Sequence, residues 1–139
     1  MTQEDKKLLL EDLSARLPYG VVLSTPNGNN PLLALVSSKK YNTIIEYDDY
    51  RGNENDISEW DGGDIEFIKP YLRSMSSMTE EERKEYELLA NRCISTSVGF
   101  IHFEAQELIN WLLKNHFDFR GLIEKGLAIE VNESNNPYK

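Results

Sequence analysis

The spacing of apolar residues changes twice along the chain, and this change constrains the fold more than any other feature. In the first 17 residues, and again after residue 79, apolar residues recur at helical spacing. Between residues 20 and 60, short apolar runs alternate with asparagine, glycine and proline, which favours strands joined by short turns. The sequence therefore predicts an α+β protein: an N-terminal helix, a small antiparallel sheet of three to four strands, then three helices.

The predicted N-terminal helix covers residues 3–17. Thr2 and Asp5 have the spacing of a capping box at its start, and Pro18 with Gly20 ends it. Apolar runs then predict strands at residues 21–23, 32–36, 41–50 and 57–60. Residues 65–78 show no clear period and are expected to connect the two halves of the chain.

Three helices are predicted in the second half. Thr79 and Glu82 form a second capping box, which starts a helix that ends near Cys93. Later helices are expected at residues 105–115 and 118–126, before a strand at 127–131 and a frayed tail at 132–139. We expect one cooperative domain over residues 1–139, with a division into subdomains 1–73 and 79–131 left open.

The motifs of common enzymes and metal proteins are missing from the sequence. A single cysteine excludes a disulfide framework and a cysteine-based zinc site, and the two histidines lack the His-Glu-x-x-His spacing. There is no glycine-rich phosphate loop and no Gly-x-Ser-x-Gly elbow. We therefore predict no catalytic residue, no metal site and no cofactor, and we expect Cys93 to be a buried, inert thiol.

The N-terminal leucines are too few for a signal peptide, and no run approaches the roughly 20 apolar residues that span a bilayer. These observations predict a cytoplasmic protein without membrane association. A chain of net charge -9 is also a poor candidate for direct nucleic-acid binding, which needs a basic face.

Almost all of the net charge lies between residues 46 and 66. Nine acidic residues and one arginine give this segment a charge of -8. Three interpretations remain open: a solvated hairpin kept soluble by its charges, a surface that attracts a basic protein, or a cation site, although the spacing of a calcium loop does not occur. The acidic partner surface would comprise Glu46, Asp48, Asp49, Glu54, Asp56, Glu59, Asp61 and Asp64.

The leading functional prediction is a non-catalytic interaction or accessory protein that uses this acidic surface. One alternative is an acidic inhibitor that mimics nucleic acid and binds a DNA-binding protein. A second alternative is a small hydrolase without a recognisable motif. The sequence does not indicate an oligomeric state.

Two segments, IKPYLRSMSSMTEEE at residues 68–82 and NHFDFRGLIEKGLA at residues 115–128, carry a resemblance. Together with residues 6–21, they resemble a family of small proteins without assigned activity in gut Bacteroidales genomes, their phages and integrated elements. Residues 24–64 diverge from this likeness. The resemblance implies a bacterial or phage-related cytosolic origin and says nothing about chemistry.

Both matched segments have the composition of joints that define a fold. Residues 69–73 would cross from the sheet to the helices, and residues 118–121 would form a tight corner. At the end of the preceding helix, His116 is expected as an imidazolium, which suits the carbonyl end. A binding groove beside these joints would have as its polar lining Tyr71, Arg73, His116, Asp118 and Arg120.

Overall fold

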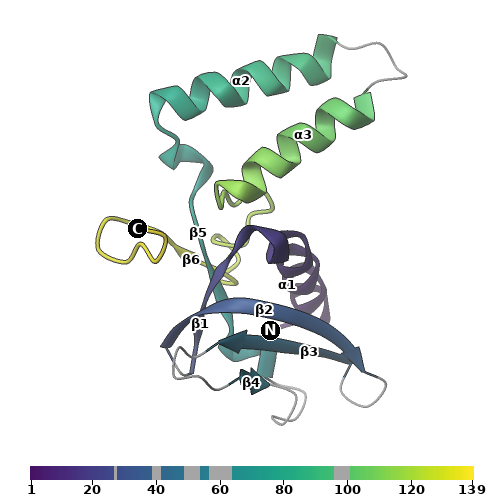
Figure 1. Cartoon of the computed structure of the whole chain (residues 1–139), viewed down its shortest axis with the longest axis vertical. Coiled ribbons are helices and arrows are strands. Elements are labelled where there is room, and N and C mark those ends of the chain that lie inside the picture. The colour runs from purple at the N-terminus through teal and green to yellow at the C-terminus, as the bar shows by residue number, and fades with distance from the viewer. Residues whose placement is uncertain (27, 39–41, 49–53, 57–63, 96–100) are drawn as a thin grey trace.

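A computed structural model describes residues 1–26, 28–38, 42–48, 54–56, 64–95 and 101–139 (Figure 1). The fold is α+β and begins with a helix, as the apolar spacing predicts. Its helices and strands are α1 (Gln3–Arg16), β1 (Val22–Thr25), β2 (Gly28–Ser38), β3 (Asn42–Asp48), β4 (Glu54–Asp56), β5 (Lys69–Leu72), α2 (Glu80–Ser95), α3 (Ile101–Lys114) and β6 (Ile129–Glu130). Short 3-10 turns lie at Leu17–Tyr19, Asp64–Phe67 and Met75–Ser77.

The strands form one mixed sheet in the order β4-β3-β2-β1-β5-β6. Every neighbouring pair is antiparallel except β5 and β6, which run parallel. The predicted antiparallel pairing therefore holds for the other neighbouring pairs and is wrong for β5 with β6. A parallel neighbour needs a long connection, and the chain supplies it by building α2 and α3 between β5 and β6.

Two strands differ from the sequence-based expectation. The predicted strand at 57–60 lies outside the described residues, and β4 precedes it. Strand β5 falls in the segment without a clear period, where Pro70 interrupts the pattern. Pro70 pairs with Leu23, which is the last pair of the β1–β5 ladder. The missing N–H of Pro70 therefore lies at the end of that ladder.

The third helix predicted after the sheet is also absent from the described part of the chain. Residues 118–126 form turns, in which the Asp118 carboxylate accepts the N–H groups of Leu122 and Ile123, each at 2.9 Å. Gly121 and Gly126 have φ angles of 75° and 72°. Such left-handed conformations end a right-handed helix, so among the described residues only α2 and α3 are α-helices after β5.

The core lies between α1 and the sheet. Helix α1 begins with the expected capping box, since Thr2 Oγ1 accepts the Asp5 N–H at 3.0 Å and Asp5 Oδ2 accepts the Thr2 N–H at 3.1 Å. This box fixes the start of the helix and directs its apolar face onto the sheet. The buried cluster comprises Leu9, Leu13, Val21, Leu23, Leu32, Ile68, Leu72, Leu122, Leu127 and Ala128.

Helices α2 and α3 form a hairpin that extends away from the sheet (Figure 1). None of the residues in α2 whose burial is described is fully buried, and α3 buries Leu112 and Leu113 at its end nearest the body. An aromatic row runs through the base of the hairpin: Tyr86 lies 6.3 Å from Trp111, which lies 5.5 Å from Phe117. The hairpin therefore rests on the body mainly at its base.

Candidate functional site

The connection between sheet and hairpin is built on Arg73, directly after β5. Its N–H donates to the His116 carbonyl at 2.8 Å, and its own carbonyl accepts the Asp118 N–H at 2.8 Å. These bonds form an isolated parallel bridge between Arg73 and Phe117. Residues 68–82 and 115–128 are thus joined through their backbones, and we call this contact the joint.

The Arg73 side chain fixes the hairpin to the joint. Its guanidinium donates to both carboxylate oxygens of Glu82 at 2.7 Å and lies 4.3 Å from the centre of the Phe117 ring. Glu82 also caps α2, because its Oε1 accepts the Thr79 N–H at 3.0 Å. The hydrogen bonds from Arg73 lower the pKa of Glu82 to about 2, so the carboxylate stays charged at neutral pH.

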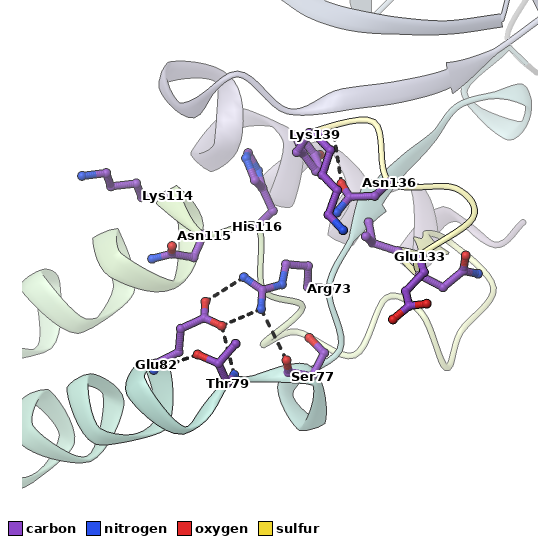
Figure 2. Close-up of a pocket in the computed structure, with 13 residues that line it drawn as sticks. Arg73, Ser77, Thr79, Glu82, Lys114, Asn115, His116, Glu133, Asn136 and Lys139 are labelled. Carbon is purple, nitrogen blue, oxygen red and sulfur yellow. Dashed lines mark hydrogen bonds and ion pairs between the residues drawn. The ribbon is translucent and has the colours of Figure 1, made fainter.

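A groove of about 710 Å³ opens beside the joint (Figure 2). Its walls are the start of α2 with the preceding turn, the end of α3, and the last residues of the chain. Most of the residues that line it carry polar or charged groups, so it offers hydrogen-bonding partners to a ligand. The lining consists of Arg73, Ser77, Thr79, Glu82, Lys114, Asn115, His116, Val131, Asn132, Glu133, Asn136, Tyr138 and Lys139.

His116 and Tyr138 stack at the inner side of this groove. Their ring centres are 3.7 Å apart and their planes differ by 8°. Burial, reinforced by the positive charges of Arg16 and Arg73, lowers the pKa of His116 to about 4. The imidazole is therefore neutral at pH 7, which corrects the expectation of an imidazolium at the helix end. Its Nδ1 is buried and has no hydrogen-bond partner among the residues that the structure describes.

The hydroxyl of Tyr138 connects two strands. It accepts the Val22 N–H of β1 at 3.1 Å and donates to the Tyr71 carbonyl of β5 at 2.7 Å. Burial raises the pKa of Tyr138 to about 12, so the hydroxyl keeps the proton that it donates. Tyr138 therefore ties the end of the chain to the sheet.

Of the five residues predicted to line a groove, Arg73 and His116 do so. Tyr71 instead donates its hydroxyl to Asn29 Oδ1 at 2.9 Å, and Asp118 caps the turn after the joint. Arg120 donates to Asp12 Oδ1 at 2.7 Å and stacks on Phe119. These three side chains stabilise the fold next to the groove without lining it.

A buried ionic cluster under the joint was not found from the sequence. Asp12 and Arg16 are both fully buried on α1 and bond at 2.6 Å, while Arg16 Nη2 donates to the Phe117 carbonyl at 2.7 Å. The available signal was an acid and a base four residues apart on one helix. The cluster links α1 to the corner that follows α3.

The acidic partner surface is described only in part. Asp49, Glu59 and Asp61 lie outside the described residues. In the register of β3 and β4, Glu46 faces Asp56 and Asp48 faces Glu54. Like charges at facing positions of an antiparallel pair are destabilising, and here two such pairs occur at the outer edge of the sheet.

The described residues hold no group of three or more histidine, cysteine or acidic side chains that could bind a metal ion. Cys93 is partly buried in α2. No helix within the described ranges is both long and apolar enough to cross a membrane. Comparisons with protein-family models, curated proteins and solved structures find no match to this chain. The bacterial or phage-related origin stays a prediction.

Proposed function

We propose that this chain is a non-catalytic interaction protein that binds a basic protein partner through residues 46–66. The supporting observation is the facing of Glu46 with Asp56 and of Asp48 with Glu54 in the β3–β4 ladder. Like charges at facing register positions destabilise a strand pair in general, and a cationic partner would relieve such repulsion. A concentrated acidic field also accelerates encounter with such a partner.

The position of the acidic strands supports a distinct docking end. Figure 1 shows β4 and helix α2 at opposite ends of the long axis of the molecule. Outside residues 46–66 the chain is nearly neutral, since that segment holds -8 of the net charge of -9. A basic partner would therefore meet the sheet edge and leave the hairpin and the groove uncovered.

The test compares two variants with equal charge. The first neutralises the ladder with Glu46→Gln, Asp48→Asn, Glu54→Gln and Asp56→Asn. The control neutralises four exposed acids elsewhere with Glu80→Gln, Glu81→Gln, Glu87→Gln and Glu124→Gln. Tagged wild-type chain and both variants are used to capture partners from a nuclease-treated bacterial lysate, read by mass spectrometry.

We expect a stoichiometric basic protein to be captured by the wild type and the control, and lost with the ladder variant. Its binding to the purified chain should weaken as salt screens the charges. Equal loss in both variants would show that only the net charge matters. Equal retention in both would exclude the ladder as the binding surface.

A nucleic-acid mimic is the second candidate, because the register of β3 and β4 spaces the acidic residues regularly. Acidic residues at every second position of both strands repeat at roughly 6.6 to 6.8 Å along each strand. A captured partner that also binds DNA should lose DNA as the chain is added. A partner that binds DNA and the chain together would contradict mimicry and leave the interaction proposal standing.

A further inference from the structure

Residues 132–139 are hydrogen-bonded to strands β1 and β5 through one side chain. Most hydrogen bonds of this segment are internal turns, such as the bond from the Ser134 N–H to Asn132 Oδ1. Asn135 reaches back to the Glu130 carbonyl, at the root of the segment. Among the described residues, every hydrogen bond from this segment to β1 or β5 comes from the Tyr138 hydroxyl.

Tyr138 occupies a specific place in the sheet. The paired register of β1 and β5 joins Ser24 to Lys69 and Leu23 to Pro70. The next step of that ladder would pair Val22 with Tyr71. The hydroxyl of Tyr138 stands at this step instead, bonded to the N–H of one strand and the carbonyl of the other. It replaces a direct strand-to-strand hydrogen bond.

Because of this placement, the segment would have a bound state and a released state, and in both the Val22 N–H and the Tyr71 carbonyl would have hydrogen-bond partners. With Tyr138 in place, the Val22 N–H and the Tyr71 carbonyl bond to its hydroxyl. With Tyr138 removed, the two groups would face each other at the same ladder step and would bond to water or to each other. Release therefore leaves no orphaned backbone group, which is what normally makes such a change costly.

The same segment is a wall of the groove. Its lining members face Arg73 and Asn115 across the opening (Figure 2). We propose that residues 132–139 are a strap, latched by Tyr138, whose release as a unit opens the groove while the rest of the fold stays intact. This strap is independent of the acidic ladder, so it can be tested without any partner.

The experiment uses backbone NMR relaxation on the full chain. Tyr138→Phe removes the bridging hydroxyl and keeps the ring, and Tyr138→Ala removes both. Tyr86→Phe is the matched control, because Tyr86 packs on Trp111 in the hairpin and its hydroxyl makes no hydrogen bond within the described residues. A soluble gadolinium chelate reports, through added relaxation, how exposed the amides of Asn115 and His116 are.

In the wild type and in Tyr86→Phe we expect order parameters of about 0.85 for the amides of residues 134–136 and 138. In Tyr138→Ala they should fall below about 0.6, the range of flexible backbone, with Tyr138→Phe lying between these values. Relaxation of the Asn115 and His116 amides by the chelate should increase in the same order. Amides of α1 and β2 should keep their hydrogen-exchange protection.

Three results would overturn the proposal. Rigid amides at residues 134–136 and 138 in Tyr138→Ala would show that another contact holds the segment. Loss of exchange protection in α1 and β2 together with the strap would make Tyr138 a part of the core. A flexible strap with unchanged exposure of Asn115 and His116 would show that the segment does not close the groove.

Discussion

At the scale of single residues, Arg73 carries the most distinct structural role. Its guanidinium binds both oxygens of Glu82 and covers the Phe117 ring, while its backbone bonds to His116 and Asp118. The planar, forked shape of arginine makes the paired and stacked contacts compatible. A lysine at this place would keep the charge and lose the geometry.

Replacing Arg73 with lysine should therefore lower the free energy of unfolding by about 1–2 kcal/mol. Urea denaturation measures this change. Arg83→Lys on the exposed side of α2 is the control, and its effect should stay within about 0.5 kcal/mol. Glu82→Gln should cost less in the Arg73→Lys background than in the wild type, because the two residues share one interaction. Additive costs would contradict the coupling.

His116 should titrate with a pKa of about 4 in an NMR experiment at the imidazole carbons. A histidine whose folded pKa lies below its unfolded value of about 6.5 binds more protons when unfolded. Stability from this group is therefore complete above pH 6.5 and is lost as the pH falls toward 4. Because the ring is partly exposed, we expect a loss on the order of 1–2 kcal/mol.

The strap variant provides the control for this titration. Burial is the largest cause of the lowered pKa of His116, and Tyr138 covers one face of its ring. Tyr138→Ala should raise the pKa of His116 toward its ordinary value. The positive charges of Arg16 and Arg73 should keep it from reaching that value. A pKa near 6.5 in the wild-type chain would contradict the buried stack.

The sequence could indicate some members of the site and not others. Arg73 and His116 fall in distinctive segments that predict joints. The role of Tyr138 could not be predicted from the sequence, because it depends on a hydrogen bond to Val22, which is 116 positions away. It also depends on β5, whose residues show no periodic pattern. Asp118 and Arg120 were expected in the groove, but the local turn and Asp12 use their hydrogen-bonding groups.

At the scale of elements, the sequence predicted a helix or strand correctly where the residues of that element alone determine its structure. The capping box at Thr2 and the leucine spacing predict α1 almost to its ends. Strand β5 was missed because its pairing with β1, rather than its own sequence period, makes it a strand. The helix expected at 118–126 failed because glycine backbone conformation and the Asp118 cap outweigh helical spacing.

Gly121→Ala distinguishes the observed turn from the predicted helix at residues 118–126, because it changes the free energy of unfolding in opposite directions in the two structures. In the turn that the structure shows, Gly121 has a φ of 75°, and alanine there should lower the free energy of unfolding by about 1–2 kcal/mol. No other atom lies within 4 Å of the added Cβ, so the backbone alone sets this cost. Inside a helix the same change would raise stability by about 1 kcal/mol. Thermal or urea unfolding decides between them.

The acidic ladder makes a prediction for the β3–β4 pair. Neutralising one facing pair with Asp48→Asn and Glu54→Gln should raise the free energy of unfolding by about 0.5–1 kcal/mol at low salt. The gain should shrink as added salt screens the repulsion in the wild type. Glu87→Gln with Glu124→Gln removes the same charge from exposed sites and should change little. Destabilisation by the ladder variant would contradict the facing register.

At the scale of the whole molecule, the chain divides into a body and a hairpin with unequal packing. The body buries ten residues in one cluster between α1 and the sheet, whereas the described residues of α2 are at most partly buried. The two parts meet through the pair of Arg73 with Glu82 and the stack of Trp111 on Phe117. The sequence left open whether the chain is a single cooperative domain or two subdomains divided between residues 73 and 79. Native-state hydrogen exchange can decide between these two predictions.

We expect the hairpin to open before the body unfolds. Native-state hydrogen exchange should give α2 amides a lower opening free energy than those of α1 and β1, because less apolar surface is exposed when α2 detaches. Leu9→Val, in the buried cluster, should lower protection in α1 and β1 by about 1 kcal/mol. Protection in α2 should not change, since its opening does not involve the body. If Leu9→Val lowers protection equally in α2 and α1, the chain opens as one cooperative unit.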